Sequence, residues 1–338
     1  MKKSTTKRVL AAAAALLPLS LLALTSPSSA ASNTTVSVVG YSVVSSAFTA
    51  LEAAYAKTQL GNGVTFTNSF GPSTTQAEDV VAGQPADVTV FSAVPDLNLL
   101  VAAGLVSKGW ASVPAAYAEK GFVTDSVVVL VTRAGNPLNI TGWNDLTKSG
   151  VQIVTPDPIS SGSARWNLLA AYESQIQQGK SKTQAKNFTN SLVANVVSEP
   201  SSASKALTAF EDGTGNVLLA YEADAKAALA AGQKIQIVDP AQNLLIQNPA
   251  ALTVAGTSNP YAVNFLNFLF SRAGQTIWVN EGFRATSPGV QSLKANLFYH
   301  PKRLATIASL GGWGKVTDTY FSSTGIITAI ENAHGFTS

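Results

Sequence analysis

Four segments of this 338-residue chain place hydroxyl side chains where a helix is expected to begin. They are Tyr41-Ser42, Gly71-Pro72-Ser73-Thr74-Thr75, Ser160-Ser161-Gly162-Ser163-Ala164 and Ser201-Ser202-Ala203-Ser204. The first N–H groups of a helix have no partner within the helix, and its N-terminus carries a partial positive charge. Hydroxyl groups beside such N–H groups suit a bound anion. The residue types at these four junctions are therefore compatible with the binding of an anion.

The simpler interpretation of each junction is helix capping. A capping serine accepts a hydrogen bond from its own helix and binds nothing else. A single junction favours capping, and the presence of four junctions in one chain weakens that interpretation without excluding it. The residues alone leave both interpretations open.

Covalent catalysis is the main alternative from another functional class. Ser161 and Ser163 could act as nucleophiles, because both lie at an expected strand-to-helix turn. No Gly-x-Ser-x-Gly segment surrounds them, and the two imidazole bases, His300 and His334, lie far along the sequence. The sequence also has no Cys, no paired His motif and no glycine-rich nucleotide motif. We therefore expect no enzymatic activity, no metal and no cofactor.

The elements that must position these residues alternate along the chain. Strands are expected over residues 35–39, 64–67, 87–91, 126–132, 152–155, 216–220 and 234–238, and helices over 46–57, 75–82, 164–174, 259–273 and 275–280. This alternation predicts an α/β protein with mostly parallel sheets. Ligands of such sheets bind where the C-termini of strands meet the N-termini of helices, which is where the four junctions are expected.

Residues 1–30 have the features of a secretory signal peptide. These features are the basic residues Lys2, Lys3, Lys7 and Arg8, an apolar run over residues 9–24, and the small residues Ser28, Ser29 and Ala30. Pro18, Ser20 and the short apolar run disfavour a membrane anchor. We expect cleavage after Ala30 and a periplasmic or extracellular location.

Removal of this segment changes the charge of the chain. It contains four of the 22 basic residues and none of the 19 acidic residues, which leaves 18 basic against 19 acidic. This balance predicts no basic surface for nucleic acid. The 308 remaining residues exceed the size at which one hydrophobic core usually keeps growing, so two lobes are expected.

One longer segment carries a family resemblance. Ser161-Gly162-Ser163-Ala164-Arg165-Trp166-Asn167-Leu168-Leu169-Ala170-Ala171 resembles the motif Ser-Gly-Gly-Ala-Arg-Trp-Asn-Tyr-Leu-Ala-Ala of the periplasmic sulfate- and thiosulfate-binding proteins of ABC importers. Other segments similar to that family are Gly135-Asn136-Pro137, Trp143-Asn144-Asp145-Leu146, Val154-Thr155-Pro156-Asp157-Pro158, the run 215–222 and Gly311-Gly312-Trp313. Together they extend over nearly all of the chain after the signal peptide.

The resemblance implies a two-lobed periplasmic binding protein of type II. Each lobe would hold a mostly parallel sheet flanked by helices, and the cleft would close on a dehydrated sulfate bound by uncharged donors. The implied segments are a signal peptide at 1–30, the first segment of lobe I at 32–120, lobe II at 121–230, the return segment of lobe I at 231–300 and a C-terminal helical segment at 301–338. The lobes would hinge near residues 113–125 and 222–240.

Position by position, the resemblance implies seven ligand-binding residues: Ser42, Ser73, Ser161, Gly162, Ser163, Ala203 and Tyr221. Ser73 and Ser161 would supply hydroxyl groups, and the residues at 42, 162, 163 and 203 would supply backbone N–H groups. Tyr221 departs from the family, which has a Trp whose indole N–H contacts the anion. The segment Ala203-Ser204-Lys205-Ala206 also departs, because it lacks the Arg of the family's Ala-Arg-Gly-Ser.

The hydrogen-bonding groups at the implied site indicate which anion it would bind. Sulfate carries no proton at neutral pH and needs donors only, whereas phosphate keeps a proton and gains from a carboxylate acceptor. None of the seven implied residues is a carboxylate, which favours sulfate or thiosulfate. Molybdate, tungstate, phosphate and an organosulfonate are the alternatives. The implied protein is a monomer that delivers the oxyanion to the membrane permease subunits of an ABC importer and binds no nucleic acid.

Two other side chains in the motif are assigned from the sequence. Arg165 is expected either to brace the site by pairing with carbonyl groups or an acid, or to lie in solvent. Trp166 is expected in the core, and Trp313 in packing between lobes.

Overall fold

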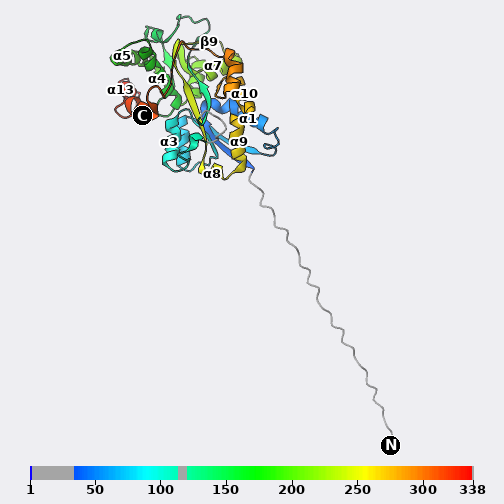
Figure 1. Cartoon of the computed structure of the whole chain (residues 1–338). Helices are drawn as coiled ribbons and strands as arrows, with labels where there is room; N and C mark the ends of the chain where they lie inside the picture. The colour runs from blue at the N-terminus through cyan, green and yellow to red at the C-terminus, as the bar shows by residue number, and fades with distance from the viewer. Residues whose placement is uncertain (2–33, 113–119, 337–338) are drawn as a thin grey trace. The chain divides into compact units, whose positions relative to one another are not determined.

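The computed structural model describes residues 34–112 and 120–336, together with Met1. From Thr34 onward these residues belong to one compact unit that contains two main sheets, each flanked by helices (Figure 1). The predicted signal peptide lies outside the described residues except for Met1.

The first sheet has six strands in the order β12-β4-β11-β3-β1-β2. Their bounds are β1 (Thr35–Tyr41), β2 (Thr65–Gly71), β3 (Val88–Val90), β4 (Phe122–Ser126), β11 (Ile246–Leu252) and β12 (Arg284–Ala285). β1 pairs in parallel with β2 and β3, whereas β11 is antiparallel to both β3 and β4. Val36 and Val38 of β1 are fully buried, as expected for β-branched residues on the core face of a strand.

The second sheet has five strands in the order β7-β6-β8-β5-β9. Their bounds are β5 (Val128–Arg133), β6 (Ile153–Val154), β7 (Val196–Ser198), β8 (Val217–Tyr221) and β9 (Ile235–Val238). β6 is parallel to β7 and β8, and β5 is antiparallel to β8 and β9. Both sheets are thus mixed rather than mostly parallel. β5 enters directly from the other sheet instead of through a crossover helix, so its direction need not match that of its neighbours.

The chain leaves the six-stranded sheet after β12, and it passes out of and back into that sheet at two further points that lie close together. One is Val127, between β4 and β5, and the other is Leu245, between β10 (Gln242–Leu244) and β11. β9 therefore lies in the five-stranded sheet, where Val238 pairs with Leu130, although residues 231–300 were expected to return to the first lobe. Both crossings also lie outside the ranges 113–125 and 222–240 expected for the hinge, and residues 113–119 of the first range are outside the described part of the chain.

Helices cover both sheets, and the two groups define halves of the molecule. The bounds are α1 (Ser45–Tyr55), α2 (Ser73–Val81), α3 (Val94–Ala102), α4 (Gly162–Gln177), α5 (Lys182–Val193), α6 (Ala203–Glu211), α7 (Glu222–Ala230), α8 (Val254–Thr257), α9 (Pro260–Phe270), α10 (Arg272–Asn280), α11 (Pro288–Lys294), α12 (Gly312–Val316) and α13 (Ile326–Ala333). We call the six-stranded sheet with α1–α3 and α8–α11 the six-stranded half. The five-stranded sheet with α4–α7 and residues 303–336 is the five-stranded half.

Residues 303–336 pack against α4 and α5. The short strand β13 (Arg303–Ala305) pairs with β10, and α13 contacts α5. Trp313 packs edge-on against Trp166 at 4.9 Å between ring centroids, and Tyr320 packs in the same way against Tyr172 at 5.1 Å. Trp166 is fully buried, as predicted, and Trp313 extends its packing at the surface.

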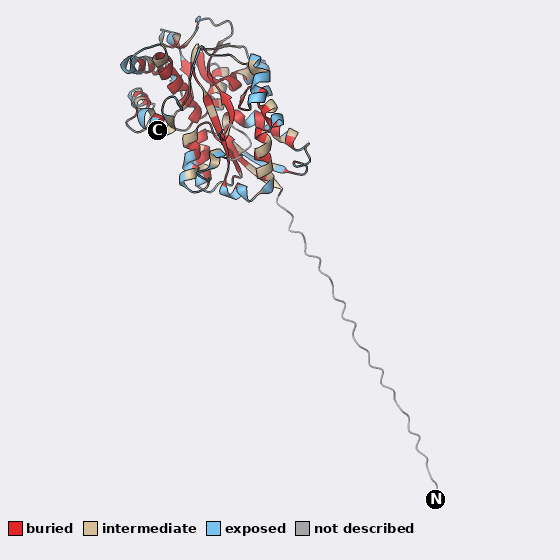
Figure 2. Ribbon diagram, in the orientation of Figure 1, coloured by how far each residue is buried: buried red, intermediate tan, exposed pale blue. Residues whose placement is uncertain are grey.

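Buried residues lie along the strands of both sheets and on the facing sides of the helices, as Figure 2 shows. Large aromatic side chains fill much of this core, including Phe48 and Trp278 in a T-shaped pair. Within the described residues, no helix is both long enough and apolar enough to span a membrane.

Candidate oxyanion site

The seven predicted site residues all lie at the ends of strands or the starts of helices. Ser42 follows β1, Ser73 is the first residue of α2, and Tyr221 is the last residue of β8. Ser161 immediately precedes α4, Gly162 and Ser163 open that helix, and Ala203 opens α6. Two of the residues belong to the six-stranded half and five to the other.

Ser92, directly after β3, connects many of these residues. Its N–H donates to the Ser73 hydroxyl at 2.9 Å, and its hydroxyl lies 2.8 Å from the hydroxyl of Tyr221. Its carbonyl accepts from Trp166 Nε1 at 2.9 Å and from Asn248 Nδ2 at 2.8 Å. Ser92 is fully buried, so these contacts bring the strand ends of both halves together.

Ser42 lies against the start of α6, which Ala203 opens. The N–H of Ser204 donates to the Ser42 hydroxyl at 3.4 Å. The ring of Tyr41, next to Ser42, lies 6.1 Å from the ring of Tyr221. Ser42 and Tyr221, the first and last of the seven predicted residues in the sequence, are thus both linked to the group around Ser92.

The first turns of α4 and α6 contain donors that are not used within the protein. The N–H groups of Gly162, Ser163 and Ala203 donate to no oxygen of the described residues. The hydroxyl of Ser161 does not cap α4, although Ser161 occupies the capping position. Ser202, in contrast, caps α6 by accepting from the N–H of Lys205 at 3.2 Å. Capping therefore explains Ser202 and does not explain Ser161.

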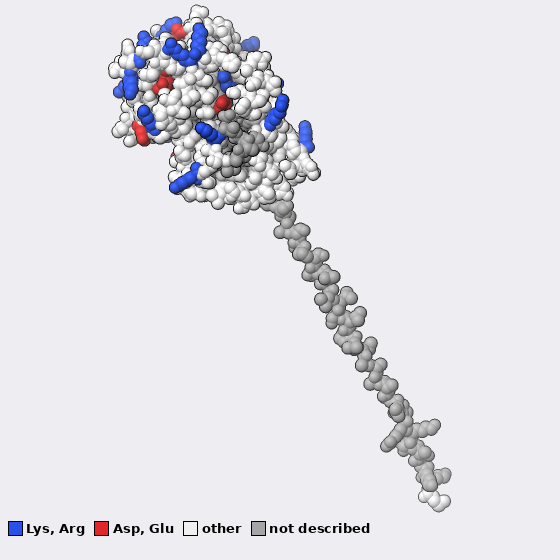
Figure 3. Space-filling view, in the orientation of Figure 1, with Lys and Arg blue, Asp and Glu red and all other residues white. Residues whose placement is uncertain are grey.

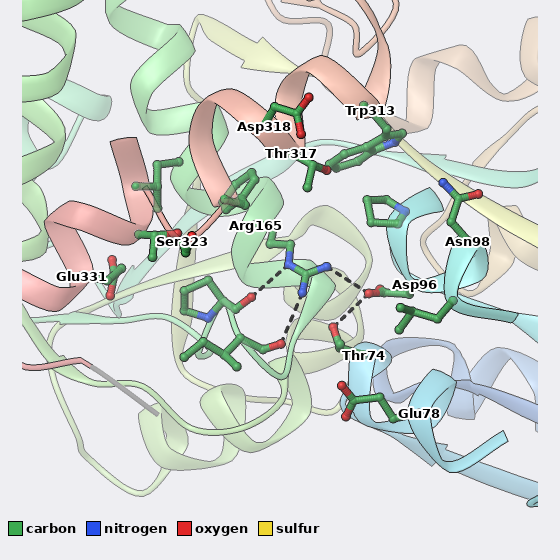
Figure 4. A pocket seen from close by; sticks show the side chains of 18 of the residues that line it. Thr74, Glu78, Asp96, Asn98, Arg165, Trp313, Thr317, Asp318, Ser323 and Glu331 are labelled. Atoms are coloured by element: carbon green, nitrogen blue, oxygen red, sulfur yellow. Dashed lines mark hydrogen bonds and ion pairs between the residues drawn. The ribbon is translucent and has the colours of Figure 1, made fainter. Parts of the chain in front are cut away.

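A buried carboxylate, absent from the sequence prediction, lies at the same place. Asp96, in the first turn of α3, is fully buried and accepts from Ser73 at 2.6 Å and from Thr74 at 2.9 Å. Arg165 of α4 donates to it at 3.0 Å and also bonds the carbonyl groups of residues 158 and 159 (Figure 4). Arg165 therefore pairs with both carbonyl groups and an acid, which is the bracing role expected from the sequence.

Asp96 adds a carboxylate beside the seven predicted residues, none of which carries one. Its charge is balanced by Arg165 from the opposite half, and its oxygens already accept three hydrogen bonds. The Ser73 hydroxyl gives its one proton to Asp96, so in this arrangement Ser73 offers its backbone N–H rather than its hydroxyl to a ligand. The sequence signal for this residue was Pro95-Asp96, since Pro at the start of a helix and an acid in its first turn are typical of an N-terminus.

Gly162 allows the two halves to approach closely. A Cβ atom at this position would lie 2.7 Å from Asp96 Oδ2 and 2.9 Å from Ser92 Cβ, both in the opposite half. These distances are shorter than any relaxed contact, so a side chain would push the start of α4 away from β3.

Burial perturbs two acidic groups beside the site. Burial raises the pKa of the Tyr221 hydroxyl, although hydrogen bonds to Ser92, Ser163 and Asn248 act in the opposite direction. Tyr221 therefore stays protonated and can donate. Burial also raises the pKa of Asp224 to about 7, and its Oδ2 has no hydrogen-bond partner.

The two histidines that the catalytic alternative would need as bases are hydrogen-bonded to other residues. His300 Nε2 lies 3.2 Å from the carbonyl oxygen of Ala295, and His334 Nε2 lies 3.1 Å from Asn190 Oδ1. Neither imidazole is hydrogen-bonded to Ser161 or Ser163. In the described part of the chain, no group of three or more His, Cys, Asp or Glu side chains is arranged to hold a metal ion.

Two α/β halves joined by crossing strands, with helix N-termini from both halves meeting at one point, define the class of two-lobed solute-binding proteins. The chain belongs to the bacterial extracellular solute-binding proteins, whose family model matches residues 36–284.

Within this family, the chain is similar to sulfate- and thiosulfate-binding proteins. The sulfate-binding protein of Synechococcus elongatus is 36% identical over 88% of this chain and 87% of that protein. The thiosulfate-binding protein of Pseudomonas aeruginosa is 30% identical over 82% of this chain and 85% of that protein. The solved structure of the sulfate-binding protein SubI from Mycobacterium tuberculosis matches with a TM-score of 0.81 and 40% identity, covering 85% of this chain and 99% of that chain. The predicted resemblance to sulfate- and thiosulfate-binding proteins is therefore confirmed.

Proposed function

We propose that this protein binds sulfate or thiosulfate outside the cytoplasm and delivers the anion to an ABC importer. The observation that carries this proposal is the set of unused donors at one place: three helix-start N–H groups and the Ser161 hydroxyl. The names of the relatives support the choice of anion. The features of residues 1–30 support export.

The proposed site binds the anion through uncharged donors. Gly162, Ser163, Ala203, Ser42 and the N–H of Ser73 would surround its oxygens, with Ser161 supplying a hydroxyl group. Each hydrogen bond to a charged group contributes about 1.5–3 kcal/mol, so a few of them offset the cost of removing a dianion from water. Tyr221 would donate through its hydroxyl, either to the anion directly or to Ser92 behind it.

The two halves would act as lobes that close over the anion. The crossings at Val127 and Leu245, together with the segment between α11 and β13, are the covalent connections about which the halves would rotate. Closure would bring Arg165 to Asp96, and the N–H of Thr74 to the carbonyl of Ser160 at 3.0 Å. A ligand that contacts both halves shifts the population toward this closed form. No chemical change of the ligand is part of the proposal.

The surface charge agrees with this role. On the face drawn in Figure 3, Lys and Arg side chains are spread among uncharged and acidic side chains, and a few lie next to one another at its upper end. This face carries no continuous basic patch of the kind that nucleic acid requires.

Calorimetry of the chain without residues 1–30 tests the proposal. We expect heat from sulfate and thiosulfate near neutral pH and none from phosphate, because a bound hydrogenphosphate needs an acceptor and Asp96 is already paired. Molybdate serves as the second comparison. A response to phosphate equal to that of sulfate, or a response to molybdate alone, would overturn the assignment of the anion.

A further inference from the structure

A groove of about 640 Å³ lies beside the oxyanion site and has walls from both halves. One wall is formed by α2 and α3, with Glu78 and Leu99, and the other by the C-terminal residues, with Trp313 and Asp318 (Figure 4). Ile159 lies at its base together with Arg165. We call this cavity the rim groove.

The rim groove depends on contact between the two halves. Arg165 crosses between them to Asp96, and the N–H of Thr74 crosses to the carbonyl of Ser160. Moving the halves apart would break these bonds and separate the two walls. A partner that fills the groove would therefore bind the closed arrangement and not an open one.

The charge in the groove is acidic. Among the described residues that line it, Arg165 is the one basic side chain, and Asp96 balances its charge. Glu78 and Asp318 are exposed and form no ion pair with a described residue. The groove thus attracts a positively charged group.

The Glu331 side chain adds a second, independent observation. It lies on α13, it is 3% exposed, and neither of its carboxylate oxygens has a hydrogen-bond donor. Burial raises the pKa of both Glu331 and its neighbour Glu199, and repulsion from Glu331 raises that of Glu199 further. Repulsion from Asp157 adds to both shifts. Each carboxyl group therefore keeps a proton to a higher pH than a solvated glutamate does, and a cation that reaches the pair would compete with that proton.

Apolar side chains flank the acidic groups. Leu99 is 38% exposed and Ile159 is 48% exposed, although both are large hydrophobic residues, and they come from opposite halves. A partner that covers both removes apolar surface from water while its cation meets the carboxylates. A small inorganic cation could not provide the apolar contact, whereas a protein segment with a basic and an apolar side chain could.

We propose that the rim groove is where the closed protein docks a basic, partly apolar segment of its membrane permease. This inference rests on the proposed function, because the permease is the partner that must distinguish the closed, loaded form. Docking at this place would depend directly on closure, because both walls of the groove are present only when the two halves are in contact. It would not require contact with the bound anion.

Binding to the importer tests this proposal. The importer that takes up sulfate in the organism of origin is reconstituted in nanodiscs, and the chain without residues 1–30 is titrated with saturating sulfate by biolayer interferometry. The double variant Asp318→Asn with Glu331→Gln and the single variant Leu99→Ala should each weaken docking about tenfold or more. Wild-type docking should be tighter at pH 8 than at pH 6, because burial raises the pKa of Glu331 to about 7 and its carboxylate attracts the partner's cation only once the proton is lost.

The control variants lie outside the groove and carry the same types of change. Asp212→Asn alters an exposed acid at the end of α6, and Leu229→Ala alters a 43% exposed leucine on α7. Both should dock as the wild type does. Sulfate affinity, measured by calorimetry for every variant, should not change, because none of these residues is in the proposed anion site.

Two results would overturn the proposal. One is wild-type docking by both groove variants. The other is sedimentation of the wild-type chain alone as a dimer that Leu99→Ala dissociates, which would identify a second copy as the occupant. Failure of wild-type calorimetry with sulfate would instead contradict the proposed function, so the two failures are distinguishable.

Discussion

The hydroxyl oxygen of Tyr221 lies 2.8 Å from Ser92 Oγ, and this short contact joins the last residue of β8 to the residue after β3. Both side chains are fully buried, and the contact connects the two halves. Either hydroxyl can donate, so one of the two protons remains available to a third group. Tyr221 thus serves the proposed site through Ser92 as well as through any direct contact with the anion.

Replacing Tyr221 by Phe should weaken sulfate binding by about 1–3 kcal/mol, since a buried donor is lost and Ser92 loses its partner. Isothermal titration with sulfate measures the change. Tyr172→Phe is the matched control: Tyr172 is equally buried, but its hydroxyl bonds the Lys182 carbonyl within one half. Unchanged affinity in Tyr221→Phe would show that Tyr221 only packs against its neighbours.

Ser161 and Ser202 should respond in opposite ways to the same substitution. Ser161→Ala removes a hydroxyl that caps nothing, so sulfate affinity should fall by about one to two decades while the unliganded protein keeps its melting temperature. Ser202→Ala removes a helix cap and should lower the free energy of unfolding by about 1 kcal/mol with little effect on binding. Calorimetry and thermal unfolding of both variants check this. A loss of stability without a loss of affinity in Ser161→Ala would return Ser161 to the capping interpretation.

The sequence predicted the helix-start junctions because their signals are local. The hydroxyl-rich turn at 160–164 and the apolar pattern after it predicted a helix at 164–174, and α4 is found at Gly162–Gln177. The direction of a strand is not local, and buried apolar runs such as that of β5 look alike in parallel and antiparallel sheets. The sequence therefore predicted mostly parallel sheets, whereas both are mixed.

Asp96 could not be assigned to the site from the sequence for the same reason. Its role depends on Arg165, which follows it by 69 residues and belongs to the other half. A lone acid in a first helical turn is ordinarily explained by the helix dipole. Only the tertiary contact distinguishes a balanced carboxylate at the proposed anion site from a solvated one.

The substitution Gly162→Ala should weaken sulfate binding without lowering the stability of the unliganded protein. Alanine favours a helix more than glycine does, so the melting temperature of the unliganded protein should not fall. In the arrangement described here the new Cβ would meet Asp96 and Ser92 of the opposite half, so closure should be hindered and sulfate affinity reduced about tenfold or more. Gly289→Ala is the control, because a Cβ there meets no atom within 4 Å. Wild-type affinity in Gly162→Ala would show that α4 does not need this close approach.

Asp224 should make the stability of the protein depend on pH. Burial raises its pKa in the folded state to about 7, well above the ordinary value of 3.8. A carboxyl group with a raised pKa favours the folded state fully below the unfolded value, and that contribution is lost as pH rises through the folded value. Between about pH 4 and pH 7 the wild type should therefore lose stability that an Asp224→Asn variant keeps.

At pH 8 the Asn variant should be more stable than the wild type by up to about 4 kcal/mol, because each pKa unit corresponds to about 1.4 kcal/mol. At pH 4 the two should differ little in stability, since both side chains are then uncharged in the folded protein and this pH lies close to the ordinary pKa of 3.8. Urea unfolding at both pH values measures the difference. Asp212→Asn, at an exposed position, should show no such dependence on pH. Equal stabilities of wild type and Asp224→Asn at pH 8 would mean that Asp224 finds a partner for its charge in the folded protein.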